Sequence, residues 1–448
     1  MTGLVCAFLT LISPHQENPR LAGATRQDKA GWINLHLKGT PSDIGFQYGY
    51  LAASEIDDAH KALLLSFSGP NYNWSWAKKA AKDLFWNKLD TEYQEEMSGQ
   101  AEGLKAKGFA YDVWDVLAYN AYIELKDYYV PYLQAQKNGK TWSVSRESCS
   151  AFVATGSTTK DGKIVMGHNL WWDYLMGQRC NVILDITPEK GNRVMMDAFC
   201  GFIHSGSDFA MNSAGLVLCE TTIAGYSGFD PNGIPEFIRM RKAIQYGKSI
   251  DDVIATFKQG NNGGYANSWL MGDTKTNEIA KLELGLKNVI VTRKSDGYIV
   301  GSNFPENEKL IAEEVPGGWD LNPKTNGCED RKLRWNTLLT ENAGKVDAEL
   351  AKSMLADTYD QANDLHGASG NTLCGRVDAG LSGACNTKVV DAGMVAKFTM
   401  AGKMGFSDGS TFSAPDYFKQ HARLSGLMPF LHSIVDQPWT LFPVEPSK

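Results

Sequence analysis

The periodicity of the apolar residues changes abruptly at Cys149, and this change constrains the fold more than any other feature. Upstream, apolar residues recur at helical spacing in three stretches, residues 41–67, 76–105 and 111–133. A polar loop at 137–147 follows. Downstream, residues 150–155 and 164–167 have the pattern of strands and flank the turn Lys160-Asp161-Gly162-Lys163. The sequence therefore predicts a β-hairpin that begins at Cys149.

Short strands and helices alternate through the rest of the chain. Strands are predicted at 181–186, 193–199, 209–211, 216–218, 268–272, 279–284, 289–293 and 298–300. Helices are predicted at 234–246, 250–259, 330–339 and 348–358, and the tail is predicted to be rich in loops. Strands grouped between helices favour stacked sheets covered by helical layers, an α+β class.

The charge pattern excludes two kinds of partner. The net charge is −7 and no block of Lys or Arg occurs, so neither nucleic-acid binding nor a polybasic membrane anchor is predicted. The apolar run 4–12 is too short for a transmembrane segment, which takes roughly 20 residues. Residues 1–24 fit a secretory signal cut near Ala22-Gly23-Ala24, or a frayed tail. Secretion, or a lysosomal or periplasmic location, would open the sequon Asn73-Trp74-Ser75 to glycosylation.

The eight cysteines contain no CxxC pair, which disfavours a zinc site and a redox motif. Loss of a signal would discard Cys6, and a catalytic role for Cys149 would leave an even number that permits disulfides. Cys374 and Cys385 bracket a short glycine-rich loop and are the first candidate pair. Buried apolar thiols are predicted at Cys180, Cys200 and Cys219.

The motifs of several enzyme classes are absent, namely GxSxG, HExxH, the P-loop and GxGxxG. Cys149 offers another nucleophile. Cleavage of the Ser148–Cys149 bond would place a free α-amine, with a pKa near ~8, beside the thiol. One residue would then supply both nucleophile and base. From its position alone, however, a lone cysteine is more often structural.

The order of short motifs along the chain favours a catalytic rather than a structural role for Cys149. The motifs are Cys149-Ser150-Ala151, Gly167-His168-Asn169-Leu170-Trp171-Trp172-Asp173-Tyr174, Ser207-Asp208-Phe209, Asn212-Ser213-Ala214-Gly215-Leu216, Glu220-Thr221-Thr222-Ile223, Tyr265-Ala266-Asn267-Ser268-Trp269, Gly301-Ser302-Asn303-Phe304 and Asn386-Thr387-Lys388-Val389. From about Gly31 to Phe442 the chain resembles the phospholipase B-like family. More distantly, it is similar to the penicillin acyltransferase and bile-salt hydrolase families.

This resemblance implies an N-terminal-nucleophile hydrolase. Its fold would be a four-layer αββα sandwich over residues 149–448, preceded by an N-terminal helical segment at 25–148. The chain would cut itself between Ser148 and Cys149, and the two fragments would stay associated. Loop residues before the cut would be partly trimmed.

The resemblance also implies roles for single residues. Cys149 matches the nucleophile, and Asn267 matches an asparagine whose amide helps to form the oxyanion hole. Asn212 lies in the Asn-x-x-Gly-Leu turn that lends a further donor, and ordinary turn chemistry is nearly as good an interpretation.

Two further positions follow from the same resemblance. His168 stands where bile-salt hydrolases have arginine, and Asp173 is the displaced counterpart of an aspartate that follows it. At the end of its strand, His168 is predicted to orient the thiol or relay a proton, and a histidine bonded to backbone is the rival interpretation. Arg331 is predicted to make a surface salt bridge rather than to bind a substrate carboxylate or phosphate.

The implied activity is deacylation of glycerophospholipids, and no metal or organic cofactor is needed for it. The substrate would be a small lipid or N-acyl molecule. Two alternatives stay open. One is an N-acyl amide hydrolase or acyltransferase. The other is a catalytically dead hydrolase scaffold with an interaction role.

Overall fold

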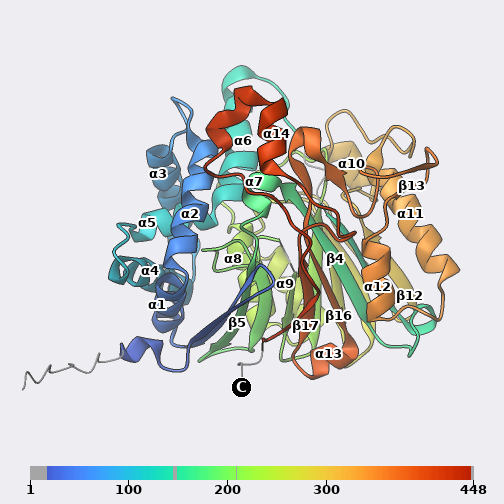
Figure 1. Ribbon diagram of the computed structural model, residues 1–448, viewed down its shortest axis with the longest axis horizontal. Helices are drawn as coiled ribbons and strands as arrows, with labels where there is room; N and C mark the ends of the chain where they lie inside the picture. Colours follow the sequence, from blue (N-terminus) through green and yellow to red (C-terminus); the bar gives the residue numbers. More distant parts are fainter. Residues whose placement is uncertain (1–17, 145–148, 208, 445–448) are drawn as a thin grey trace, which may run out of the picture.

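Two stacked β-sheets form the centre of the molecule in the computed structural model, which describes residues 18–144, 149–207 and 209–444 (Figure 1). In these ranges the larger sheet has nine strands in the order β1-β2-β5-β6-β7-β8-β9-β10-β11. Their bounds are β1 Thr25–Lys29, β2 Trp32–Gly39, β5 Val182–Pro188, β6 Val194–Ala198, β7 Phe209–Asn212, β8 Leu216–Thr222, β9 Asn267–Asp273, β10 Glu278–Leu284 and β11 Val289–Lys294. Only the pair β2–β5 is parallel among these described neighbours.

The smaller sheet runs in the order β12-β3-β4-β16-β17-β18, with β15 paired to β16. Its strands are β3 Ser150–Thr155, β4 Val165–Asp173, β12 Gly297–Gly301, β15 Arg376–Val377, β16 Ser382–Asp391, β17 Met400–Met404 and β18 Thr440–Phe442. A separate two-stranded ladder joins β13 (Tyr359–Asp360) to β14 (Leu365–His366). The predicted hairpin after Cys149 is confirmed as β3–β4. Strand β16 was not predicted within the loop-rich tail, and it pairs with β4 along its whole length.

Helices cover the outer face of each sheet. Those on the larger sheet are α1 Pro41–Leu51, α2 Ala53–Leu64, α3 Trp74–Phe85, α4 Thr91–Ala106, α5 Val113–Asn120, the π-helical turn η4 Glu124–Tyr129, α6 Val130–Asn138, α8 Glu236–Tyr246 and α9 Ile250–Lys258. Those beside the smaller sheet are α11 Gly327–Glu341 and α12 Ala348–Leu355. Helix α10 Glu308–Glu314 packs through Leu310 into the core of the larger sheet. Short helices at the strand ends are α7 Tyr174–Gly177, α13 Ala392–Ala396 and α14 Ala414–Gln420. The α+β class with N-terminal helices and two main sheets is confirmed.

Strand β3 shows why the layers stack in this way. Successive side chains of a strand point to opposite faces. Ala151 and Val153 lie in the apolar core between the sheets, whereas Phe152 and Ala154 lie in the core beneath the helices of the smaller sheet. The Phe152 ring packs 5.1 Å from that of Trp335 on α11. The sequence of a strand that is covered on both faces is a nearly continuous apolar run, and the sequence of β3 has this pattern.

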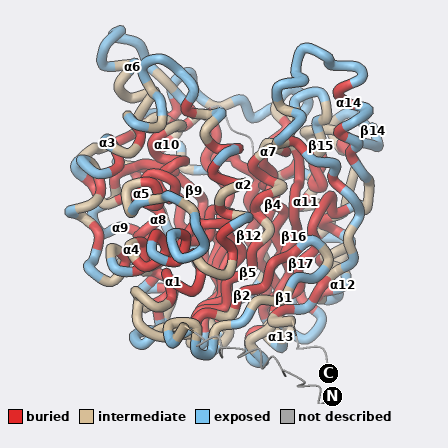
Figure 2. Tube along the Cα trace, turned by 60° about the vertical axis from the view of Figure 1, so that its left-hand side comes forward, coloured by how far each residue is buried: buried red, intermediate tan, exposed pale blue. Residues whose placement is uncertain are grey.

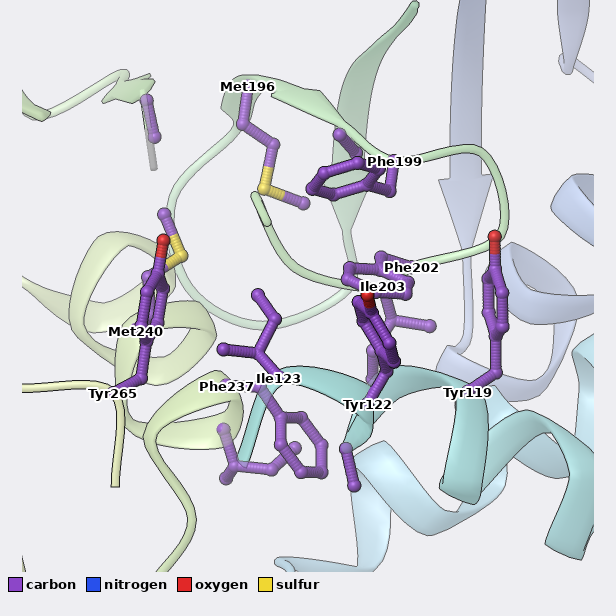
Figure 3. Packing of buried hydrophobic residues seen from close by; sticks show 14 of the residues in the cluster. Tyr119, Tyr122, Ile123, Met196, Phe199, Phe202, Ile203, Phe237, Met240 and Tyr265 are labelled. Atoms are coloured by element: carbon purple, nitrogen blue, oxygen red, sulfur yellow. The ribbon is translucent and has the colours of Figure 1, made fainter. Parts of the chain in front are cut away.

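The segment upstream of Cys149 is more than a helical layer. Its predicted helices are present, but Trp32–Gly39 forms strand β2, which pairs in parallel with β5. The predicted N-terminal helices are therefore confirmed, and strands β1 and β2, which were not predicted, precede them. Figure 3 shows Tyr119, Tyr122 and Ile123 of this segment packed against residues of the β6–β7 connection and of α8.

The strands are the most deeply buried part of the chain, while α6 and α14 project into solvent (Figure 2). None of the helices in the described ranges is both long and apolar enough to cross a bilayer.

Candidate active site

Cys149 lies directly before β3 and is buried. Its φ is +98°, in a region that residues other than glycine rarely occupy and that costs energy to maintain. Upstream, Val144 makes two backbone hydrogen bonds to the chain that follows β8. Its N–H donates to the Tyr226 carbonyl at 2.8 Å, and its carbonyl accepts from the Gly225 N–H at 2.9 Å. The predicted cut before Cys149 also involves Ser148, which lies outside the described residues.

Arg331 of α11 binds the backbone of Cys149. Its Nη1 donates to the Cys149 carbonyl oxygen at 2.5 Å, and both terminal nitrogens donate to Asn303 Oδ1 at 3.2 Å. The guanidinium lies 5.0 Å from the centroid of the Trp171 ring. Arg331 is fully buried, so the predicted surface salt bridge is wrong. The Cys149 carbonyl and Asn303 Oδ1 are both neutral acceptors, so these contacts do not neutralise the positive charge of the guanidinium beside Cys149.

Asn303 connects Arg331 to the larger sheet. Its Nδ2 donates to the Thr222 carbonyl at 3.0 Å, and Thr222 at the end of β8 is paired with Asn267 at the start of β9. A continuous chain of contacts therefore runs from Cys149 through Arg331 and Asn303 to the strand that carries Asn267. It joins the two sheets at one end of the molecule.

The amide of Asn267 is fully buried, and neither Nδ2 nor Oδ1 has a hydrogen-bond partner within the described ranges. The hydroxyls of Thr221 and Ser268, which face each other across β8 and β9, are also buried without a partner in that part of the chain. Buried polar atoms are usually paired, and unpaired ones require an explanation such as an absent water or ligand. Asn267 and Ser268 are successive residues of β9, so their side chains point to opposite faces of the sheet, and the unpaired amide of Asn267 offers one of these faces a partner for a polar ligand atom.

His168 on β4 is paired with Ala151 of β3 and with Lys388 of β16. Burial lowers its pKa well below the usual histidine range, the positive charge of Lys388 lowers it further, and the backbone of Glu220 opposes the shift. The imidazole is therefore neutral at physiological pH. Lys388 itself is fully buried and forms an ion pair of 2.8 Å with Asp197 on β6.

Asn212 lies elsewhere. Its Nδ2 donates to the carbonyls of Ile244 (2.8 Å) and Gly247 (2.9 Å), and its Oδ1 accepts from the N–H groups of Ala214 (3.0 Å) and Leu216 (3.1 Å). It precedes the start of β8, whereas Asn267 is paired with the end of β8. All of its hydrogen-bonding groups are engaged in this turn, which fits the turn interpretation of Asn212, and its role as an oxyanion donor stays a prediction.

Asp173 also has a structural contact. It ends β4 and caps α7, its Oδ1 accepting the Met176 N–H at 2.9 Å. It is paired with Ser382, whereas Asn169, next to the start of β3, is four residues back along β4. Asp173 therefore lies at the same end of β4 as the start of β3, with its carboxylate engaged as a helix cap, and its catalytic role stays a prediction.

The other cysteines of the described ranges are buried. Cys374 and Cys385 are both thiols in the structure, so the predicted disulfide between them is wrong. The Cys385 Sγ instead donates to the Gly383 carbonyl at 3.3 Å. Burial raises the pKa of Cys374 to about 11 and that of Cys180 well above the usual range. Such thiols are poor nucleophiles.

An acidic pair beside Arg331 was not apparent from the sequence. Asp330 is fully buried at the start of α11, and its Oδ1 accepts the Ala362 N–H at 2.8 Å. Burial and the adjacent carboxyl of Asp360 raise the pKa of Asp330 to about 7. The role of Arg331 itself also needed the structure, although the Gly301-Ser302-Asn303 motif already marked its acceptor.

The family model for phospholipase B matches residues 45–331. The chain therefore belongs to the phospholipase B family.

Two relatives with similar sequences illustrate this membership. A protein of Archaeoglobus fulgidus is 24% identical over 252 residues, which cover 54% of this chain and 42% of that protein. Bovine phospholipase B-like 1 is 24% identical over 412 residues, which cover 79% of this chain and 74% of that protein. The chain thus spans less than half the length of the archaeal relative.

Two solved structures are similar. One is a mutant conjugated bile acid hydrolase from Clostridium perfringens, with 13% identity, a TM-score of 0.33 and coverage of 57% of this chain and 89% of that chain. The other is penicillin V acylase from Agrobacterium tumefaciens, with 10% identity, a TM-score of 0.35 and coverage of 58% and 83%.

Proposed function

We propose that this protein is an N-terminal-nucleophile cysteine hydrolase with an αββα sandwich, which cuts itself before Cys149 and then hydrolyses acyl bonds in lipids. One observation carries the proposal. Cys149 combines a strained φ of +98° with a carbonyl held by a buried arginine, and both are linked to the strand that begins with the unpartnered amide of Asn267.

The strain at Cys149 supports the self-cleavage step. A residue held at such a φ stores roughly 1–3 kcal/mol, which is available to destabilise the adjacent peptide bond. The Cys149 thiol attacks the Ser148 carbonyl carbon, the peptide C–N bond breaks, and the nitrogen leaves as the α-amine. Water then hydrolyses the thioester, which restores the thiol and gives Ser148 a carboxylate.

Arg331 supports the nucleophile in the cut enzyme. A positive charge a few ångströms away disfavours protonation of the new α-amine and favours the thiolate. The amine is then a base near neutral pH, and the thiol is easier to deprotonate. Because the guanidinium has only neutral acceptors in its contacts with Cys149 and Asn303, its charge is not cancelled by them.

In the catalytic cycle the thiolate attacks the acyl carbonyl, and Asn267 Nδ2 donates to the oxyanion that forms. The alcohol or amine leaves with a proton from the α-ammonium group, and water hydrolyses the acyl thioester to a fatty acid. A preorganised amide donor of this type contributes roughly 3–4 kcal/mol to the transition state. His168, neutral and on the strand next to β3, serves as a positioning residue for the nucleophile's strand.

The substrate class comes from the family. Relatives named phospholipase B-like suggest ester bonds of glycerophospholipids. The same atoms also suit the amide bond of an N-acyl amine, so both substrates enter the test.

Intact mass and N-terminal sequencing of the purified protein test the first step. We expect a fragment beginning Cys-Ser-Ala-Phe in the wild type and in Cys200→Ala, a matched buried cysteine on the β6–β7 connection. We expect a single uncut chain in Cys149→Ala. Uncut wild-type chain at both neutral and acidic pH contradicts the proposal.

Release of fatty acid from phosphatidylcholine and from N-acyl amines tests the second step. We expect release by the cut wild type and none by Cys149→Ala. Adding an acceptor amine separates hydrolysis from acyl transfer, since transfer yields a new amide in place of free fatty acid. A cut protein without activity on either substrate would support the scaffold alternative.

A further inference from the structure

The π-helical turn η4 (Glu124–Tyr129) belongs to the segment upstream of the proposed cut and contacts the chain directly before Asn267. The Tyr128 hydroxyl oxygen accepts a hydrogen bond from the Ala266 N–H at 3.1 Å. Tyr128 is fully buried, so water does not compete for this bond. Burial also raises the pKa of Tyr128 well above the usual range, so the phenol stays neutral.

This contact acts on the neighbour of the proposed oxyanion donor. Ala266 is held at both of its backbone groups: its N–H by Tyr128, and its carbonyl by the Ile223 N–H at 2.9 Å. Asn267 has no hydrogen bond of its own side-chain amide in the described ranges. The direction of that amide therefore depends on the backbone that Tyr128 and Ile223 hold.

The preceding residue is strained. Tyr265 has a φ of +50°, and its hydroxyl donates to Glu220 Oε1 at 3.0 Å. A bulky residue keeps such a backbone conformation only when the surroundings hold it on several sides. The Tyr128 contact is one of those constraints, since it binds the very next residue.

The other end of η4 holds the beginning of the same loop. Glu124 Oε1 accepts from Asn262 Nδ2 at 2.5 Å, and Asn262 Oδ1 accepts the Gly264 N–H at 3.0 Å. The loop of residues 262–266 is thus held at both ends by one π-helical turn. An ordinary α-helix would place residues 124 and 128 differently, and π-turns are often found at functional sites.

We propose that Tyr128 is a positioning residue for the Asn267 amide, so that the segment upstream of Cys149 completes the oxyanion site formed downstream. The inference rests on the proposed function. The upstream fragment then has a role in catalysis beyond covering the sheet, because the cut enzyme still needs the Tyr128 hydroxyl.

Tyr128→Phe tests this, because it removes one oxygen atom and keeps the ring. Tyr48→Phe is the matched control: Tyr48 is a buried tyrosine of the same upstream segment, and its hydroxyl oxygen accepts the Gly201 N–H at 2.6 Å. The readouts are fragment masses, melting temperature, and kcat and KM for a short-chain phosphatidylcholine in monomeric solution.

We expect both variants to be cut and to lose a similar few degrees of melting temperature. Tyr128→Phe should lower kcat at least tenfold with KM within twofold of wild type, and Tyr48→Phe should change neither by more than twofold. In an Asn267→Ala background, adding Tyr128→Phe should lower kcat by less than twofold, because its effect passes through the missing amide.

Two results would overturn the inference while the proposed function stands: equal kcat losses in the two tyrosine variants, or a full tenfold loss from Tyr128→Phe without Asn267. An uncut or inactive wild type would instead remove the proposed function, and the inference with it. A Tyr128→Phe protein that does not fold is replaced by Tyr128→Trp, which keeps a buried ring but has no acceptor for the Ala266 N–H, with the same expected result.

Discussion

A fully buried asparagine lies near each end of strand β8, and the two differ in every contact. Asn212, before β8 begins, makes four hydrogen bonds that hold the turn and the end of α8. Asn267, opposite the last residue of β8, makes none with its side chain in the described ranges. Strand β8 has seven residues, so its two ends lie roughly 20 Å apart. The satisfied amide holds the fold, and the unsatisfied amide is available to a ligand.

The largest expected effect is on catalysis at the Asn267 end. Asn267→Ala should lower kcat by roughly 10²–10³-fold, because it removes a donor to the oxyanion. Asn267→Asp is the matched variant, with the same shape but without the donor, and should lose as much. Steady-state kinetics on the cut enzyme measures both. An alanine variant with more than a tenth of wild-type kcat would contradict the comparison.

The Asn212 end should show the reverse pattern. Asn212→Ala should lower the free energy of unfolding by about 2–4 kcal/mol, since four hydrogen bonds are lost and their backbone partners stay buried. The kcat of the folded fraction should stay within twofold of wild type. Urea unfolding of the uncut Cys149→Ala chain, with and without Asn212→Ala, measures the first value. A stable but inactive Asn212→Ala enzyme would return this residue to the active site.

An effect that depends on pH extends the comparison to the carboxyl group of Asp330, next to Arg331. The pKa of Asp330 is raised to about 7 by burial and by Asp360. The folded chain therefore keeps a proton that the unfolded chain has released, and this contribution to stability is full below about pH 4 and is lost as the pH rises to about 7. Asp330→Asn has no such proton.

The difference in unfolding free energy between wild type and Asp330→Asn should therefore fall by up to about 1.4 kcal/mol per pH unit in this window. Urea titrations of the uncut chain at several pH values measure it. The same pH dependence in both proteins would show that the carboxyl pair does not share a proton.

The smallest expected effect concerns Asp173. Asp173→Ala removes the cap of the short helix α7 and should cost about 1 kcal/mol of stability. Because its carboxylate is engaged in this cap, four residues beyond the partner of Ser150, self-cleavage and kcat should stay within twofold of wild type. Thermal melting and fragment masses provide the test. Loss of cleavage in a folded Asp173→Ala protein would restore its predicted catalytic role.

The strands and helices with strong local patterns were predictable. Strand β3 and the helices α8 and α9 lie within two residues of their predicted bounds, because turn residues and apolar spacing specify them locally, whereas β4 continues six residues beyond its predicted end. Strands β2 and β16 were not predicted. Each is defined by partners far away in the chain, since β2 pairs with β5 and β16 with β4.

The candidate site divides in the same way. The sequence determined by itself that Cys149 starts a β-hairpin, that Asn267 precedes a strand, and that both belong to an ordered set of motifs. Only the tertiary structure decided which asparagine is unsatisfied and that Arg331 is buried against Cys149, 182 residues away. The physical reason is that local pattern sets the backbone, whereas burial and hydrogen-bond partners come from segments that meet only after folding.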